Sequence, residues 1–442
     1  MSPGALLDLL IRWFHVIAGI MWIGNSLLFN WLDRNLVKKE GIDGEIWLLH
    51  SGGFYQIEKK MLRPGQMPDP LHWFMWQNLS TWASGILLLV VVYYLGEGAW
   101  LVDPGAGHAS YSAAVTAAVG TLLGGWVVYD LLWRSPLRRS PAVAGAICGA
   151  LLLAATWWLS QVMTPRAAFI HVGVLLGTLM TGNVWLIIIP SQRDLVDATR
   201  EGREQDRSLS LRAKQRSIHN NYMTFPLIFI MVSNHFPSTY SHRLNWLILA
   251  VLMVGGALVR HFMNIRFTFR GWRPALVGSA ATAIAVACAL VASPARSGRS
   301  DAELAAGPPV AFDSVRAIVS LRCVACHSAT PSDALFRVAP NGLMLDTPEQ
   351  IAAAAPRMRV RVEGGTMPFA NRTKMTDEER ATVVRWIAQG ASLHARPAAK
   401  AAPSPDAKAA APPAAPAPAA KAPAAKAAPA PAAQAAPAPA AK

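Results

Sequence analysis

Residues 142–160 read AVAGAICGALLLAATWWLS, an apolar run without a charged side chain. A helix that crosses the hydrocarbon core of a bilayer needs about 20 consecutive, mostly apolar residues, so this run predicts a transmembrane helix. Stretches of similar length and character recur on both sides of it. The eight predicted spans are residues 6–29, 77–95, 112–132, 142–160, 168–189, 221–236, 245–262 and 274–293. The sixth contains Pro226 and Asn234, which membrane helices tolerate where neighbouring helices satisfy the backbone.

The composition of the chain agrees with a membrane protein. Hydrophobic residues make up 53% of the 442 residues and charged residues only 15%, whereas a soluble domain carries about 25% charged residues. The formal net charge of +15 would favour a nucleic-acid partner in a soluble protein. Here most basic residues lie in loops between apolar runs, so we expect a lipid bilayer as partner and no nucleic acid.

The basic residues alternate between successive loops. Lysine and arginine are concentrated after the first, third, fifth and seventh spans. The loop after the second span has none, the loop after the fourth has only Arg166, and the loop after the sixth has only Arg243. Because basic loops stay on the cytoplasmic side, we predict a multi-pass protein of the bacterial inner membrane. Its N-terminus and its C-terminal part are then on the periplasmic side.

The sequence changes character after the eighth span. Residues 294–310 form a polar linker, and residues 311–395 have the helical periodicity of a small domain. Thr376, with Glu379 three positions later, has the capping-box pattern that begins a helix. Residues 396–442 are almost entirely alanine, proline and lysine, which cannot bury a core, so we predict a disordered tail.

The small domain contains the most specific motif of the chain, Cys323-Val324-Ala325-Cys326-His327. Two thiols three positions apart lie on one helical turn, where they can add to the two vinyl groups of one haem while His327 binds the iron. A zinc half-site would need two further ligands, and the sequence contains no second cysteine pair. A thioredoxin-like dithiol belongs in a βαβ unit, which the sequence does not predict. The motif therefore predicts one covalent haem c.

A methionine is the expected second axial ligand, because Met/His ligation suits electron transfer. Met367, in the sequence GGTMP at 364–368, follows His327 by 40 residues and precedes the last predicted helix. The other methionines of the domain are interpreted as packing or surface residues: Met344, Met358 and Met375. The predicted fold class is all-α, with an eight-helix transmembrane bundle over residues 1–293, a small c-type cytochrome domain and a disordered Ala/Pro/Lys tail.

Ionisable residues inside membrane helices are costly and are therefore functional candidates. Arg12, His15, Gly19 and Trp22 recur at helical spacing on one face of the first span. His171 lies in the fifth span, which enters from the same predicted side. Because a glycine one turn from a histidine leaves room for a flat macrocycle, His15 and His171 are candidate ligands of a membrane haem b. The alternative is that each histidine forms hydrogen bonds between helices.

A second set of polar residues lies toward the predicted cytoplasmic ends of the spans. Its histidines are candidate proton acceptors: His50, His72, His219 and His261. Aromatic rings stack on flat molecules and basic groups neutralise anions. The candidate substrate contacts are therefore Lys59, Trp73, Trp76, Asn220 and Arg260. The alternative is that the basic residues serve membrane topology and the tryptophans form an interfacial belt.

These features resemble the bacterial integral-membrane urate oxidases (urate hydroxylases), in which a multi-helix domain is fused to a C-terminal cytochrome c. The resembling stretches are RWFHVIAGIMWIG at 12–24, HSGGFY at 50–55, LHWFMW at 71–76 and Thr81-Trp82, with the Cys323 motif and Met367. The resemblance covers residues 1–395 and leaves out the tail. It implies oxidation of urate to 5-hydroxyisourate, but it transfers no catalytic residue to this chain.

The predicted function is therefore membrane-bound oxidation of urate, with electrons passed through the covalent haem to a soluble or membrane respiratory cytochrome. Oxygen need not be the direct oxidant in such a reaction. The alternative is an electron-transfer subunit that relays electrons from a quinol or a partner dehydrogenase. The loop after the first span, rich in histidine and tryptophan, favours the enzyme, because a simple relay needs no pocket.

Overall fold

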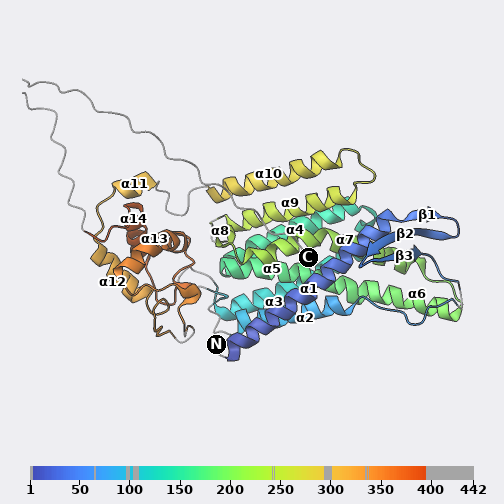
Figure 1. The fold of residues 1–442 in the computed structure, drawn as a ribbon, viewed down its shortest axis with the longest axis horizontal. Helices are drawn as coiled ribbons and strands as arrows, with labels where there is room; N and C mark the ends of the chain where they lie inside the picture. Colours follow the sequence, from blue (N-terminus) through green and yellow to red (C-terminus); the bar gives the residue numbers. More distant parts are fainter. Residues whose placement is uncertain are drawn as a thin grey trace, which may run out of the picture. The chain divides into compact units, whose positions relative to one another are not determined.

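The computed structural model describes residues 3–63, 66–95, 100–102, 109–240, 242, 244–292, 301–333, 336 and 338–394. These residues form a bundle of long helices, a small sheet, and a group of shorter helices toward the C-terminus (Figure 1). The predicted tail at 396–442 and the first part of the predicted linker lie outside the described residues.

Six helical stretches in the described part of the chain are long and apolar enough to cross a membrane. This finding is compatible with a multi-pass membrane protein. One of the six is a continuous run of three helical segments that ends at Glu201. The six stretches are α1 (Pro3–Asn35), α3 (Tyr111–Arg134), α4 (Pro141–Val162), the run α5 (Pro165–Gly182) with η4 (Asn183–Ile188) and α6 (Ile189–Glu201), α9 (Asn245–Asn264) and α10 (Trp272–Ala292).

The predicted count of eight spans is corrected to six by this criterion. The second predicted span corresponds to α2 (Trp76–Leu89), which continues into a π-helical turn, η1 (Val90–Tyr94), but has a polar first half that begins with Gln77 and Asn78. The sixth corresponds to α7 (Arg207–Ser233), a helix of 27 residues whose first half is polar and basic. Both helices still pack within the bundle, α2 against α1 and α7 against α5 and α9.

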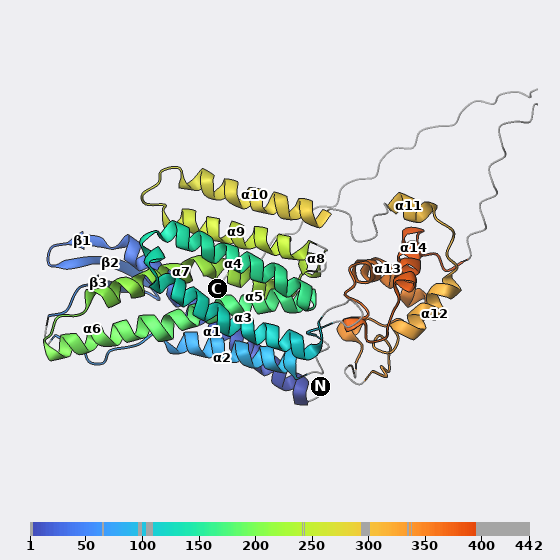
Figure 2. The same ribbon diagram turned by 180° about the vertical axis from the view of Figure 1, so that it is seen from behind.

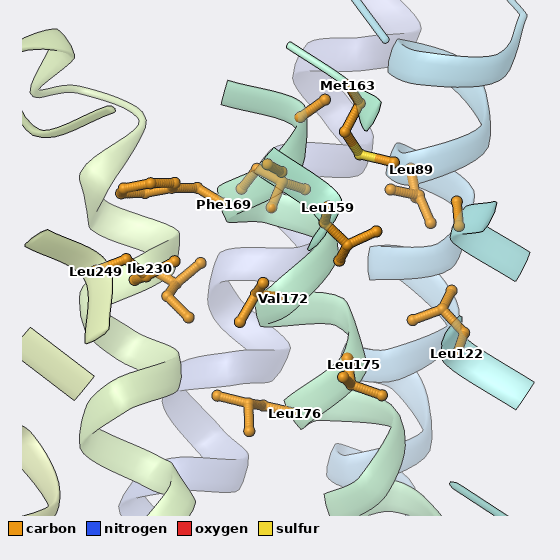
Figure 3. Packing of buried hydrophobic residues seen from close by; sticks show 14 of the residues in the cluster. Leu89, Leu122, Leu159, Met163, Phe169, Val172, Leu175, Leu176, Ile230 and Leu249 are labelled. Atoms are coloured by element: carbon orange, nitrogen blue, oxygen red, sulfur yellow. The ribbon is translucent and has the colours of Figure 1, made fainter. Parts of the chain in front are cut away.

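Helix α5 lies inside the bundle and is buried on nearly every side. In Figure 3 its side chains Phe169, Val172 and Leu175 lie between Ile230 of α7 on one side and Leu122 of α3 on the other. A helix that is apolar all round belongs in the interior of a large or membrane-embedded bundle. Because η4 continues directly from α5, the polar residues at the start of η4 also lie inside the bundle.

Glycines allow the closest contacts between helices. A Cβ atom added at Gly173 of α5 would lie 2.7 Å from Ile230 Cγ2 of α7. One added at Gly255 of α9 would lie 2.5 Å from Ala283 Cβ of α10, which runs beside α9 (Figures 1 and 2). Lipid tails are as apolar as leucine, so helices in a membrane associate through such close packing rather than through exclusion of water.

The loop after α1 contains a three-stranded antiparallel sheet, so the all-α prediction is wrong for this segment. Its strands, in spatial order, are β1 (Val37–Lys39), β2 (Ile42–His50) and β3 (Gly53–Lys59). His50 pairs with Gly53, and the connecting Ser51 and Gly52 have positive φ values of 50° and 77°, as a tight hairpin turn requires. Strand β3 exposes most of its side chains, so no apolar alternation marks it in the sequence. The sheet lies beside the same end of the bundle as α6 (Figures 1 and 2).

The C-terminal helices enclose a hydrophobic core of their own. These helices are α11 (Asp301–Ala306), α12 (Phe312–Arg322), α13 (Pro348–Glu363) and α14 (Asp377–Ala388). Val315, Val319 and Trp386 are almost completely buried, and Leu304 is buried with them although the sequence places it in the linker. The capping box predicted at Thr376 is confirmed at the start of α14. Short helical turns also occur at η3 (Pro136–Arg139), α8 (Pro237–Tyr240), η5 (Pro340–Gly342) and η6 (Phe369–Asn371).

Candidate functional site

Cys323, Cys326 and His327 follow α12 on one turn of backbone. The N–H groups of Cys326 and His327 both donate to the Cys323 carbonyl, at 3.1 and 2.9 Å. Burial raises the pKa of the Cys323 thiol to about 12 and also raises the pKa of Cys326. A reactive dithiol has a lowered thiol pKa instead. Among the described residues, no group of three or more His, Cys, Asp or Glu side chains is placed to hold a metal ion.

The imidazole of His327 is oriented for a ligand. Its Nδ1 donates to the Leu343 carbonyl, 3.0 Å away, which leaves Nε2 as the nitrogen that can bind a metal. A hydrogen bond of this kind holds the ring and the tautomer of metal-binding histidines. The backbone is anchored as well, because the N–H of Leu345 donates to the His327 carbonyl at 2.8 Å.

Met367 lies on the loop between α13 and α14, and backbone contacts hold this loop. The N–H groups of Thr366 and Met367 both donate to the Arg361 carbonyl, at 2.9 and 3.1 Å, and Arg380 of α14 donates to the Met367 carbonyl. The Met367 side chain is half-buried. Two thiols on one turn, an oriented imidazole and a thioether are the donor set of a c-type haem. The residues present therefore fit this group.

His15 and His171 bond to different levels of the continuous helix α2–η1. His15 Nδ1 lies 3.0 Å from the Ser84 hydroxyl, whereas His171 Nε2 accepts from the Tyr94 hydroxyl at 2.9 Å. His171 Nδ1 donates to the Ala167 carbonyl at 2.7 Å, so both of its ring nitrogens are hydrogen-bonded. At about 1.5 Å of rise per residue, Ser84 and Tyr94 are about 15 Å apart along the helix axis.

This pair of histidines therefore does not fit a shared haem b. Hydrogen bonding between helices, the alternative named above, describes how His15 and His171 lie. A membrane haem stays a prediction without an identified ligand pair.

The candidates contributed by the segment between α1 and α2 lie mostly at the surface. His50 and His72 are exposed, and so is Lys59, which forms a 2.6 Å ion pair with an aspartate of α1. Trp73 is half-buried, and the exposed Trp76 packs edge-on against Trp185 of η4 with ring centroids 5.8 Å apart. Among the residues that the structure describes, no hydrogen bond, ion pair or ring contact joins these five candidates to one another.

His219 and Asn220 of α7 belong to a buried polar network. The Tyr129 hydroxyl of α3 lies 2.7 Å from His219 Nδ1 and accepts from Nδ2 of Asn183 at 2.9 Å. The same Nδ2 donates to Asn220 Oδ1, 2.8 Å away. Asn183 and Asn220 are both buried. Polar groups in the interior of a membrane bundle are costly, so a network of this kind is a candidate functional site.

Arg260 and His261 of α9 belong to a second polar group. Arg260 Nε and Asn264 Nδ2 both donate to Oδ1 of Asn221, at 2.8 and 2.7 Å, and Arg260 is buried. His261 Nδ1 lies 2.8 Å from the Tyr222 hydroxyl. Successive residues of α7 therefore bond to two different groups. The four predicted candidates at these helix ends do not share one site.

Sequence patterns did not reveal the residues around Arg216, whose charge was attributed to membrane topology. Arg216 is buried, and its Nη2 donates to Asp130 Oδ1 at 2.6 Å. Arg134 Nε pairs with Oδ2 of the same carboxylate, also at 2.6 Å. Asp130 could have indicated this ion pair in the sequence, because an acidic residue inside an apolar span requires a partner.

A cavity of about 200 Å³ lies beside this ion pair. Residues of α3, η3, η4 and α7 line it: Trp133, Arg134, Arg138, Ile187, Arg212, Gln215 and Arg216. The Trp133 ring also contacts the ring of His219, with centroids 4.0 Å apart. The cavity thus gathers several cations around Trp133, whose ring contacts the hydrogen-bonded His219, and such a lining can hold an anion.

The fold and these sites define a multi-helix bundle with a buried basic group around Arg216, and its six apolar stretches are compatible with a multi-pass membrane protein. Comparison with known proteins adds the family, because the family model described as "Urate oxidase N-terminal" matches residues 4–292. The chain therefore belongs to the urate oxidase N-terminal family, as the resemblance in the sequence predicted. Membership indicates an oxidoreductase related to urate oxidation. Neither the curated proteins nor the solved structures contain a match to this chain.

Proposed function

We propose that this protein is a membrane-bound enzyme that oxidises urate to 5-hydroxyisourate and passes the electrons through a covalent haem c to a respiratory cytochrome. The observation that carries the proposal is the combination of two features in one chain. A urate oxidase N-terminal region covers the helical bundle, and the residues after it have the donor set of a c-type haem.

The reaction balances without oxygen as a reactant. Urate and one water molecule give 5-hydroxyisourate, two protons and two electrons, as the water oxygen forms a bond to C5 of the purine. The haem, when bound, accepts these electrons one at a time. Two electrons therefore require two successive transfers, and no peroxide forms.

The roles of the C-terminal residues follow from their positions. Cys323 and Cys326 would hold the porphyrin through thioether bonds, and His327 Nε2 and the Met367 thioether would hold the iron, which would supply one-electron chemistry. The hydrogen bond from His327 Nδ1 to the Leu343 carbonyl supports this role, because it orients the ring before the iron is bound.

The bundle must bind the urate anion and accept its protons. Of the four candidate histidines, His219 fits this role best, because it is hydrogen-bonded to Tyr129 and its ring contacts Trp133, which lines the cavity together with arginines. His50 and His72 are exposed, and His261 belongs to the separate Arg260 group. A hydrogen bond that sets the orientation of an imidazole is a common property of general bases.

Anaerobic reduction by urate tests the proposal. Urate is added to the purified full-length protein without oxygen, and the visible spectrum of the haem and the amount of 5-hydroxyisourate are followed. Because one chain carries one c-type haem, one urate should reduce the haem of two chains. The matched control is the Cys323→Ala/Cys326→Ala variant. A spectrum that urate leaves oxidised, but that a quinol reduces, would overturn the enzyme in favour of the electron-relay alternative.

A further inference from the structure

We propose that the cavity between the ends of α3 and α7 is the binding site for the urate anion. This inference rests on the proposed function, and it names the site and the groups that recognise the substrate. The cavity lies beside the loop between α3 and α4, which the sequence predicts to be cytoplasmic.

The size of the cavity limits the ligand to a small molecule. Its volume is about 200 Å³, below the range of about 300–1,000 Å³ that is common for drug-sized ligands. Four structural elements converge on it, with Trp133 at the end of α3, Arg138 in η3, Ile187 in η4 and Gln215 in α7. A bicyclic oxopurine fits this class of ligand, whereas a dinucleotide does not.

The charge of the lining selects an anion. Four of the seven lining residues are arginines and none is acidic. Membrane topology accounts for Arg134, Arg138 and Arg212, whose side chains are exposed at the helix ends. It does not account for Arg216, whose side chain is only 5% exposed. Arg216 neutralises Asp130 through Nη2, and its Nη1 is the donor that a ligand in the cavity can use.

Two buried donors at the cavity have no acceptor in the described structure. Nη2 of Arg216 donates to Asp130, but its Nη1 is buried without a hydrogen-bond partner. Nε1 of Trp133, a side chain that is also buried, lacks a partner as well. The nearby thiol of Cys148 does not replace one, since sulfur is a weak acceptor. Buried donors are nearly always satisfied in proteins, so an acceptor atom of a ligand is expected here.

The lining also suits a flat molecule with alternating donors and acceptors. The planar groups of Trp133 and Arg216 contact other rings: the Trp133 ring is tilted by 44° against His219, and Arg216 lies over Tyr129 at 4.7 Å. Gln215 supplies both a donor and an acceptor. Urate offers carbonyl oxygens to Arg216 and Trp133, N–H groups to the Gln215 carbonyl oxygen, and a negative charge to the arginines.

Two variants of the haem-loaded, full-length protein test the site. Arg212→Gln removes a cation at the cavity without touching the buried Asp130 pair, and Trp133→Phe removes the unpaired donor while keeping an aromatic ring. The matched control is Arg193→Gln, an exposed arginine of α6 outside the cavity. Equilibrium dialysis with labelled urate gives Kd, and anaerobic haem reduction gives KM. We expect Kd and KM to rise about ten-fold or more for Arg212→Gln, as for loss of a charge-assisted hydrogen bond. Arg193→Gln should change neither.

The outcomes separate this inference from the proposed function. If the unaltered protein oxidises urate and both cavity variants keep its Kd and KM, the cavity is not the urate site although the function stands. If the unaltered protein neither binds nor oxidises urate, the function itself fails. Cardiolipin vesicles and inorganic phosphate are added as competitors. If Arg212→Gln weakens only cardiolipin binding, the cavity holds a lipid headgroup and the inference is overturned.

Discussion

The two arginine partners of Asp130 should contribute very differently to stability. Both lie 2.6 Å from the same carboxylate, but the side chain of Arg216 is 5% exposed and that of Arg134 is 58% exposed. Breaking a buried ion pair costs about 3–5 kcal/mol, whereas an exposed pair contributes about 0–1 kcal/mol. In the Arg216→Gln variant Asp130 still has Arg134 as a partner. We therefore expect the free energy of unfolding to fall by about 3 kcal/mol, the lower end of the range for a buried pair.

The assay is unfolding of the purified protein in mixed micelles, followed by the helical circular dichroism signal. Arg134→Gln is the matched control and should lower the free energy of unfolding by at most about 1 kcal/mol. Asp130→Asn leaves the charge of Arg216 buried without its partner and should be at least as damaging as Arg216→Gln. The double variant should recover part of the loss, because the two changes are coupled. Equal destabilisation by Arg134→Gln and Arg216→Gln would refute the reasoning that burial decides how much each ion pair contributes to stability.

Three further predictions concern other parts of the chain. Gly255→Leu should force α9 and α10 apart and lower the melting temperature. Gly278→Leu should leave the melting temperature nearly unchanged, because an added Cβ meets nothing within 4 Å there. A similar drop in melting temperature for both variants would contradict this packing. Met367→Ala should keep the covalent haem on a denaturing gel but lower its reduction potential, because a thioether ligand raises it; an unchanged potential would assign another ligand. The hydrogen bond from Arg322 lowers the pKa of Glu379 below its ordinary value of 4.5. The ionised Glu379 therefore stabilises the folded protein above pH 4.5, and this stabilisation is lost as the pH falls through the lowered pKa. Glu379→Gln should therefore flatten the acid limb of a denaturation series against pH, and an unchanged limb would exclude this contribution.

Features that depend on neighbouring residues were predictable from the sequence. The apolar run at 142–160 lies within α4, and the helix that the capping box at Thr376 predicts begins one residue later. The predicted closeness of the two thiols belongs to the same group, because the N–H groups of Cys326 and His327 both donate to the Cys323 carbonyl. Haem attachment at this turn stays a prediction. The family resemblance was also carried by short stretches of sequence, and the family match confirms it over residues 4–292.

The sheet after α1 shows where such patterns fail. Its register depends on a turn at Ser51 and Gly52, and strand β3 has no buried face that an alternating apolar pattern would mark. The separation of His15 and His171 was equally hidden. Their spans were correctly predicted as helices, but the residues of α2 and η1 that each ring meets depend on how three helices pack.

The sequence by itself determined the apolar helices, the tight turn from Cys323 to His327 and the family, because each rests on residues within a short stretch of the chain. Only the tertiary structure decided which polar residues share a site. Arg216 and Asp130 are 86 residues apart in sequence and 2.6 Å apart in space. No local pattern distinguishes Arg216 from the arginines that serve membrane topology, because the helix that packs opposite Arg216 decides whether its side chain is buried.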